Sequence, residues 1–360
     1  MKIDKMIKVI SLSFLLFLSA CSKSQQQDGI GKEEKPVTLT QTEFKNPVFK
    51  PVLADPSVLQ GSDGWFYAYG TEDDWGDGQG NRLVPVVRSL DLVKWTSVGN
   101  AFAAKPVWKT NGGIWAPDVV KVNNKYYMYY SFSTWQDTNP GIGLAIANQP
   151  GGPYSDQGKL FLSNEVDVSN TIDPFYIEGN DKKYLFFGSY SSSANQGTYA
   201  LELSSDGRAI VDLGQKVKIA AGDFEAVMIH KRGNFYYFFG SKGGCCNGAN
   251  STYNVRVGRS SQLLGPYLDQ AGRNITERGN GTLLLAGNER YAGPGHNSRI
   301  ITDKGGNDWL MYHAIDRADP LVPNGASKRA LMLDKITWVN DWPTIKNQTP
   351  GNEIQAGPAW

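Results

Sequence analysis

The sequence has few of the residues that build metal clusters, disulfide scaffolds or nucleic-acid surfaces. Its 360 residues include only three cysteines and three histidines, and its formal net charge is +1 at pH 7. No C-x-x-C spacing occurs, so the cysteines indicate no metal site. Basic residues do not gather in a block, and nucleic acid is therefore not an expected partner.

A sustained helical stripe is also missing between Asn46 and Ile345, where short β-rich runs alternate with turn clusters. The composition is 40% apolar and 12% aromatic, with 40 glycines, which is typical of a folded chain with many tight turns. We therefore expect one all-β domain over residues 46–345, followed by a C-terminal tail over 346–360. Aromatic faces without excess charge suit sugars, because the C–H faces of sugars stack on rings.

The N-terminus has no apolar run long enough to cross a membrane, but it has the form of a targeting segment. Three lysines precede an apolar stretch from Val9 to Ala20, which is too short for a spanning helix. Leu18-Ser19-Ala20-Cys21 resembles a bacterial lipoprotein signal, although a cysteine can also end such a run by chance. We expect a signal peptide over 1–20, acylation of Cys21 and a polar tether over 21–45. The protein would then be exported and lipid-anchored to a bacterial membrane, facing the periplasm or the cell exterior.

The two remaining cysteines, Cys245 and Cys246, are adjacent in a glycine-rich turn. In an oxidising compartment they can form a disulfide, and two reduced thiols fit the same turn. The sequence leaves both states open.

A strand-turn-strand unit occurs five times. In each copy a polar, ionisable residue precedes an apolar run, a polar turn and a second run rich in aromatics; the leading residues are Asp55, Asp118, Asp173, Glu225 and His296. Strand-turn-strand units that recur at roughly 50 residues are typical of four-stranded propeller blades. The sequence therefore predicts a five-bladed β-propeller with a central channel. If each leading residue opens the innermost strand of its blade, these side chains meet around the channel. The run Arg329–Trp338 alternates with period two and is expected to close the ring.

Three acids in these units have the residue types needed to cleave a glycosidic bond. That reaction needs one acid to protonate the leaving oxygen and a second carboxylate to activate water or to attack. Asp55, Asp173 and Glu225 are expected at the same phase of their blades. Each alone is explained by turn opening or amide capping, but a ring of acids at one depth forces like charges together and raises at least one pKa.

Several segments resemble glycoside hydrolase family 43, and the resemblance spans nearly all of the chain after the targeting segment. The segments are Ala54-Asp55-Pro56-Ser57, Ile114-Trp115-Ala116-Pro117-Asp118, Asn170-Thr171-Ile172-Asp173-Pro174, Phe224-Glu225-Ala226 and Gly293-Pro294-Gly295-His296-Asn297. Gly243-Gly244-Cys245-Cys246 with Ser251–Ser260 looks like the endo-1,5-α-L-arabinanases of that family. The resemblance implies hydrolysis of arabinan with inversion, with Asp55 as general base, Glu225 as general acid, and Asp173 as the residue that orients the acid and tunes its pKa.

Two departures keep the substrate open. Ala54 stands where arabinanases often have histidine, and Val227 stands where proline is usual. Exo-acting α-L-arabinofuranosidases and β-xylosidases share the same three acids. A rival of another class is a non-catalytic lipoprotein that binds glycans at the cell surface. Such a protein would be expected to lose at least one acid, and this chain retains all three.

The resemblance extends to residues around the acids. It implies a bound cation, commonly calcium, near His296, and because calcium prefers oxygen ligands the imidazole would act mostly through water. Arg329 is expected to reach the centre and to hold Asp173 ionised. Trp115 is expected to stack on a sugar, with a core position as its alternative, and Asn170 and Ser189 are weaker candidates for substrate hydrogen bonds. His230, His313 and Asp118 are given no catalytic role, and the enzyme is expected to be a monomer.

Overall fold

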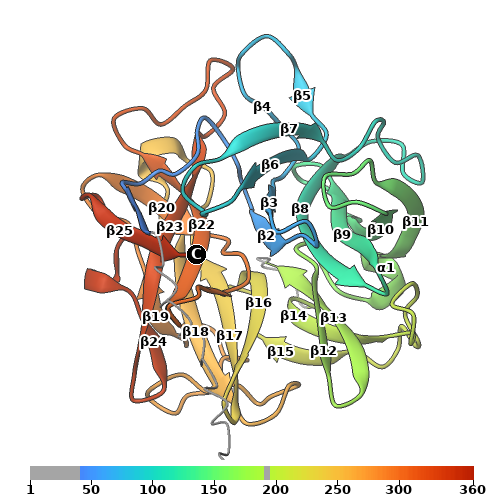
Figure 1. Ribbon diagram of the computed structural model, residues 1–360. Helices are drawn as coiled ribbons and strands as arrows, with labels where there is room; N and C mark the ends of the chain where they lie inside the picture. The colour runs from blue at the N-terminus through green and yellow to red at the C-terminus, as the bar shows by residue number, and fades with distance from the viewer. Residues whose placement is uncertain (1–40, 190–194) are drawn as a thin grey trace, which may run out of the picture. The chain divides into compact units, whose positions relative to one another are not determined.

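The computed structural model describes residues 41–189 and 195–360, so the predicted signal peptide (1–20), Cys21 and most of the predicted tether lie outside the described residues. Within the described part, no helix is long and apolar enough to cross a membrane. Five antiparallel sheets follow one another in chain order (Figure 1). This arrangement confirms the predicted five-bladed β-propeller.

The first three blades have four strands each, and in every blade the strands lie side by side in chain order. Blade 1 is β2 (Ser57–Gln60), β3 (Phe66–Tyr69), β6 (Pro85–Ser89) and β7 (Thr96–Asn100). Blade 2 is β8 (Gly113–Val122), β9 (Lys125–Ser133), β10 (Gly141–Ala147) and β11 (Ser155–Leu162). Blade 3 is β12 (Phe175–Gly179), β13 (Lys182–Ser189), β14 (Gly197–Leu203) and β15 (Val217–Ala220).

The last two blades continue the same order. Blade 4 is β16 (Glu225–Arg232), β17 (Phe235–Lys242), β18 (Asn254–Ser260) and β19 (Thr282–Leu285). Blade 5 is β20 (Tyr291–Gly295), β22 (Asp308–Asp316), β23 (Arg329–Val339) and β24 (Trp342–Thr344), with the short β21 (Ile301–Thr302) also on β22. Outside the blades lie the hairpin β4 (Asp73–Asp74) and β5 (Asn81–Arg82), the single-turn helix α1 (Ser163–Val166), and the 3₁₀ turns η1 (Gly248–Asn250) and η2 (Lys346–Gln348).

The ring closes where the two ends of the propeller meet on blade 5. β23 pairs with β22 on one side, and the chain over 48–53 hydrogen-bonds to Leu331 and Arg329 of β23 on the other. β1 (Gln41–Phe44) pairs with β25 (Gln355–Ala359). The folded unit therefore extends beyond the expected 46–345 at both ends, because each end segment gains its strand partner only from the other.

The core lies between neighbouring blades. Alternate side chains of a strand point to opposite faces of its sheet. In β13, Tyr184 and Phe186 pack toward blade 4, whereas Leu185 and Phe187 pack toward blade 2. Because both faces of a blade are covered, the second strand of each unit reads as a continuous aromatic and aliphatic run.

Candidate active site

One residue in each blade adopts the left-handed backbone conformation just before the regular pairing of the first strand begins. These residues have φ between 44° and 57° and are Asp55, Ala116, Asp173, Ala226 and His296. This conformation is disfavoured for residues with a Cβ. In blades 2 and 4 the first strand pairs with the second strand both before and after the left-handed residue. At that residue the first strand has a β-bulge, in which two of its residues lie opposite one residue of the second strand. The chain turns there, so the side chains around it face the channel.

Two of the leading residues, Asp118 and Glu225, do not occupy the position in the blade that the sequence repeat predicted for them. The left-handed position holds Ala116 in blade 2 and Ala226 in blade 4, not Asp118 or Glu225. Glu225 lies one residue earlier, opposite Ser241. Asp118 lies two residues after Ala116, where it is buried. A repeat aligned on charge alone could not reveal the extra residue that the bulge inserts.

Each left-handed residue is held by a side chain of the preceding blade that accepts its backbone N–H. The acceptor–donor pairs are His313 Nδ1 with Asp55 (3.0 Å), Thr71 Oγ1 with Ala116 (2.8 Å), Ser131 Oγ with Asp173 (2.8 Å), Asp173 Oδ2 with Ala226 (2.9 Å) and Ser241 Oγ with His296 (2.9 Å). In blade 3 the position equivalent to Ser131 of blade 2 and Ser241 of blade 4 is Gly188, which has no side chain to accept a hydrogen bond. The carboxylate of Asp173 therefore accepts the N–H of Ala226 instead. Asp173 is thereby fixed beside the blade that carries Glu225.

A pocket of about 900 Å³ opens where these residues meet. The predicted site residues that line it are Asp55, Trp115, Asn170, Asp173, Glu225, His296 and Arg329. The one remaining predicted residue, Ser189, ends β13, and its side chain lies outside what the structure describes. Side chains separated by more than a hundred residues in the sequence therefore share one cavity.

Asp55 is held as a carboxylate. Arg329 Nη1 donates to both of its oxygens at 3.0 and 3.1 Å, and Thr71 Oγ1 donates to Oδ2 at 2.6 Å. Burial raises the pKa of Asp55, but Arg329, the nearby imidazoles and Thr71 outweigh it and hold the pKa well below its usual range. Arg329 was expected to help hold Asp173 ionised, and its charge does act in that direction. Burial and the neighbouring acids outweigh it, and the hydrogen bonds of the guanidinium go to Asp55 instead.

The other two acids have raised pKa values. Burial raises the pKa of Glu225 to about 7, helped by the charge of Asp55 and opposed by a hydrogen bond from Tyr253 and by Arg329. Burial and the neighbouring Glu225 raise the pKa of Asp173 well above its ordinary value. The pocket therefore holds one ionised acid and a pair that retains a proton near neutral pH, which is the condition for separate base and acid roles.

Two histidines lie beside Asp55. The Nδ1 atoms of His296 and His313 are 3.3 and 3.4 Å from Asp55 Oδ1. Burial lowers the pKa of both imidazoles, that of His313 to about 3, so both are neutral at pH 7 and Arg329 is the cation on Asp55. His313 was given a structural role from the sequence, yet it anchors the Asp55 amide directly.

The surroundings of His296 do not form a side-chain metal site. Among residues 41–189 and 195–360, no group of three or more His, Cys, Asp or Glu side chains is arranged to hold a metal ion. The nearest carboxylate, Asp55, is already engaged by Arg329. The residues present therefore do not fit a directly coordinated cation, and no step of the mechanism runs through a metal.

The pocket wall also contains two adjacent cysteines and an exposed tryptophan. Cys245 and Cys246 form a disulfide on the wall, which decides between the two states that the sequence allowed. Trp135 is 75% exposed at the pocket and lies 5.7 Å from Trp115 between ring centroids. Thr71 and Trp135 gave no sequence signal, because their roles depend on loop geometry.

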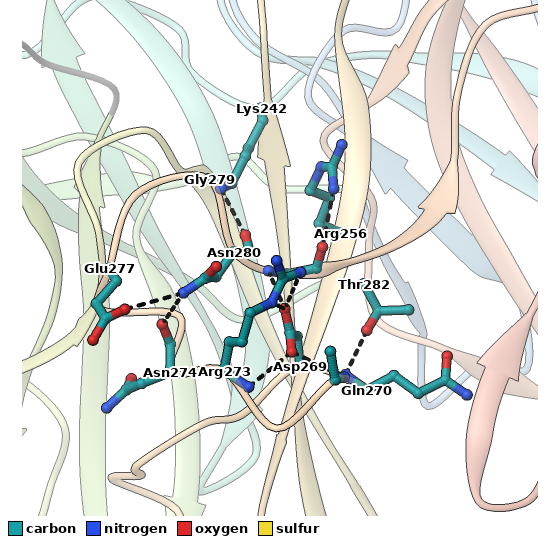
Figure 2. Close-up of polar contacts among 12 residues, drawn as sticks. Lys242, Arg256, Asp269, Gln270, Arg273, Asn274, Glu277, Gly279, Asn280 and Thr282 are labelled. Carbon is teal, nitrogen blue, oxygen red and sulfur yellow. Dashed lines mark hydrogen bonds and ion pairs between the residues drawn. The ribbon is translucent and has the colours of Figure 1, made fainter.

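Figure 2 shows a polar network in blade 4 that joins the loop between β18 and β19 to Lys242 of β17 and Arg256 of β18. Lys242 Nζ donates to Asp223 Oδ2 at 2.8 Å and to the carbonyl of Asn280 at 2.7 Å. Asn280 Nδ2 in turn donates to the carbonyl of Asn274 at 2.9 Å. Asp223 lies two residues before Glu225, and Lys242 follows Ser241, the residue paired with Glu225, so this network ties the chain before the acid to the neighbouring strand.

The geometry of the pocket agrees with the family that the sequence matches. The sequence profile of Glycosyl hydrolases family 43 matches residues 44–343. This chain belongs to that family. It is therefore a glycoside hydrolase, and the resemblance inferred from its motifs is confirmed.

Curated members of family 43 and solved structures resemble the chain over most of its length. An extracellular endo-α-(1→5)-L-arabinanase of Bacillus subtilis is 33% identical over 308 residues, covering 81% of this chain and 87% of that protein. An extracellular exo-α-(1→5)-L-arabinofuranosidase of Cellvibrio japonicus is 32% identical over 319 residues, covering 81% and 85%. The structure of a Cellvibrio cellulosa α-L-arabinanase complexed with arabinohexaose has a TM-score of 0.70 at 29% identity, covering 82% of this chain and 96% of that one.

Proposed function

We propose that this glycoside hydrolase cleaves α-1,5-linked L-arabinan at internal bonds, by a single displacement that inverts the anomeric configuration. The observation that carries the proposal is the opposite electrostatic bias of two acids in one pocket: Arg329 and Thr71 hold the pKa of Asp55 well below its usual range, whereas burial raises the pKa of Glu225 to about 7. The similarity to endo-arabinanases supports the substrate and the mode of cleavage.

In this mechanism Asp55 removes a proton from a water molecule, and the water oxygen bonds to the anomeric carbon. The glycosidic bond breaks as Glu225 gives its proton to the departing oxygen. Inversion requires the two carboxyl groups to lie about 6.5–9.5 Å apart, so that water fits between them and the sugar. Asp173 is proposed to orient Glu225, which its hydrogen bond to Ala226 N–H and its coupling to Glu225 support.

Replacing the acid tests the proposal. Glu225→Gln keeps the shape of the side chain but removes the proton, so kcat on arabinan should fall about 10²–10⁴-fold. An aryl α-L-arabinofuranoside needs little protonation of its leaving group and should lose much less. The wild-type rate on arabinan should also decline as the pH rises through about 7, since the acid must be protonated. Equal losses on the two substrates would contradict the acid role.

Exo action on arabinan, or action on β-xylosides, is the alternative within the family. The similarity to an exo-arabinofuranosidase supports it almost as well as the endo-arabinanase does, and Ala54 and Val227 depart from the arabinanase pattern. Product profiles on linear arabinan, arabino-oligosaccharides and xylo-oligosaccharides separate these options. Endo action predicts a rapid fall in viscosity with mixed oligomers. Arabinose alone from the start would favour exo action, and retention on arabinan without new reducing ends would favour a binding protein.

We also propose export and anchoring through acylated Cys21. The similarity to extracellular enzymes supports export. Radiolabelled palmitate should enter the wild-type protein and not Cys21→Ser, and labelling of both would argue against the anchor.

A calcium ion held through water beside His296 and a monomeric state remain predictions. Calorimetry with added calcium checks the first, and light scattering checks the second. An unchanged melting temperature with added calcium would count against the calcium site. A dimer mass would count against the monomeric state.

A further inference from the structure

The wall of the pocket contains an acid, Asp73, that the proposed mechanism does not use. Asp73 opens β4, so it belongs to the hairpin β4–β5 that the chain inserts between β3 and β6 of blade 1. Its side chain is half-buried and lines the same pocket as the three proposed catalytic acids. The two proton transfers of the mechanism do not explain why an acid is placed there.

Asp73 is the middle one of three consecutive acids, and it differs from its two neighbours. Glu72 is paired with Lys105 at 2.7 Å. Asp74 Oδ1 accepts the N–H of Gly76 at 2.8 Å. In the part of the chain that the structure describes, no side chain donates a hydrogen bond to the Asp73 carboxylate or forms an ion pair with it. Its oxygens therefore remain available to a molecule in the pocket.

The hairpin that carries Asp73 is packed tightly against the rest of the propeller. Trp75 lies edge-to-face on Phe49 at 5.5 Å between ring centroids, and the guanidinium of Arg82 lies 4.1 Å from the centre of the Trp75 ring. Gly76 approaches Pro323 so closely that a Cβ at position 76 would lie 2.3 Å from Pro323 Cδ. The backbone beside Asp73 is thus held in place, and a side chain on a rigid element can bind a ligand at a defined position.

Asp73 also lies close to the proposed base. Thr71, two residues earlier in the chain, donates to Asp55 Oδ2 at 2.6 Å. Two residues span at most about 7 Å of chain, so the Cα atom of Asp73 lies within that distance of the Cα atom of Thr71. The sugar unit whose anomeric carbon faces Asp55 is therefore the unit that Asp73 can reach.

The chemistry of that unit limits what a carboxylate can bind. In an α-1,5-linked arabinofuranose, C1 and O5 form the linkages, and the hydroxyl groups on C2 and C3 remain as donors. An ionised carboxylate only accepts hydrogen bonds, and such charge-assisted bonds are strong. Burial, opposed by Arg329, raises the pKa of Asp73 to about 6, so the group is mainly ionised at pH 7.

We propose that Asp73 is a substrate-binding residue that accepts a hydrogen bond from the 2- or the 3-hydroxyl of the arabinosyl unit at the reaction centre. It would thereby select sugar units in which that hydroxyl is present and unsubstituted. Asp73 gives up no proton and takes none in this role. The proposal rests on the proposed function, because it takes an α-1,5-linked arabinosyl unit as the occupant of the pocket.

Replacing Asp73 tests the contact. In Asp73→Ala the kcat/KM on arabino-oligosaccharides should fall about 10–100-fold, since a hydrogen bond to a charged group is lost. The matched control is Asp77→Ala on the same hairpin, where the carboxylate pairs with Arg82 and does not line the pocket. This control should keep a kcat/KM close to that of the wild type. An unchanged kcat/KM in Asp73→Ala, or an equal loss in both variants, overturns the proposal.

Substrates that lack one hydroxyl separate a direct contact from an effect on the hairpin. The parent substrate is an aryl α-1,5-arabinobioside, and the two analogues lack the 2- or the 3-hydroxyl in the unit that bears the aryl group. A site built to bind a hydroxyl discriminates against the analogue without it. The factor lost in Asp73→Ala should therefore shrink to about one on one of the two analogues, which identifies the bound hydroxyl. The same factor on the parent and on both analogues overturns the proposal.

A second variant keeps the test valid if Asp73→Ala does not fold. Asp73→Asn keeps the shape of the side chain and one acceptor oxygen but removes the charge. It should lose less kcat/KM on the parent than Asp73→Ala, and the loss should again disappear on the same analogue; a folded Asp73→Asn with the same loss on all three substrates overturns the proposal. Wild-type protein that cleaves neither arabinan nor the arabinobioside would instead overturn the proposed function, so the two failures can be distinguished.

Discussion

Arg329 makes the protonation state of Asp55 differ from that of the other two acids in the pocket. A single guanidinium nitrogen contacts both oxygens of Asp55 and neither oxygen of Asp173. Asp55 therefore remains ionised although it is buried, while burial raises the pKa of Glu225 and Asp173. Carboxyl groups of similar intrinsic acidity thus acquire different protonation states from their neighbours.

Arg329→Gln should therefore shift the acidic limb of the activity profile. Asp55 must be ionised to act as base, and its pKa is lowered in the folded protein, so activity is present above that pKa and is lost as the pH falls through it. Without the cation the pKa rises, and the acidic limb of kcat/KM should move up by about 1–3 pH units. Arg273→Gln, which breaks an ion pair remote from the pocket, serves as control. An unchanged acidic limb in Arg329→Gln would refute the assignment of the base.

At this scale the sequence predicted residue identities better than contacts. Asp55, Asp173, Glu225 and Arg329 were each expected at the centre, and each lines the pocket. The partner of Arg329 was not predictable, because β23 can present that side chain to either of two nearby acids. Tyr253 lies in a segment that the sequence singled out, but the place of its ring in the pocket depends on the space left by Gly295.

The elements of the fold depend on a left-handed residue at the entrance of every blade. The aromatic second runs predicted strands correctly, since both faces of each blade are buried. The residue of each first strand that occupies the left-handed position was not predictable. Polar residues near the bulge, such as Asp118, look alike in the sequence but form buried hydrogen bonds and ion pairs instead. Asp118 Oδ2 accepts from Arg299 at 2.6 Å and from Tyr176 N–H at 2.7 Å, which ties blades 5, 2 and 3 together.

Ser131→Ala tests the role of these anchors. The substitution leaves the buried N–H of Asp173 without its acceptor, which should cost about 1–3 kcal/mol of unfolding free energy in denaturant titrations. The kcat on arabino-oligosaccharides should fall as well, because Asp173 is released. Ser241→Ala removes the equivalent acceptor from His296 N–H and should cost similar stability with a smaller loss of kcat. Wild-type stability in both variants would show that the anchors contribute nothing.

The whole propeller is closed by its two ends. β25 pairs with β1, Ala359 N–H donates to Asp303 Oδ2 at 3.0 Å, and Trp360 lies 4.6 Å from Phe66 between ring centroids. The pairing of β25 with β1 could not be predicted from the sequence, because the short run at 355–359 has no alternation and its partner lies more than 300 residues away. The expected tail is instead a strand that joins blade 5 to blade 1.

Deletion of residues 355–360 should therefore lower the unfolding free energy by at least about 2–3 kcal/mol, since a tryptophan and its neighbours lose their buried contacts. Thermal unfolding followed by circular dichroism measures the change. Ile354→Ser, at a side chain that is 70% exposed, is the matched control and should leave the melting temperature nearly unchanged. A truncated protein as stable as wild type would mean that the ring does not depend on this pair.

The anomeric form of the first product tests the central claim most directly. The claim is that Asp55 activates water on one side of the sugar while Glu225 protonates the leaving oxygen on the other. Proton NMR of early hydrolysis of arabino-oligosaccharides should detect the β-anomer at the newly formed reducing end before mutarotation produces the α-anomer. Initial appearance of the α-anomer would contradict the account, because it requires two displacements and a covalent intermediate.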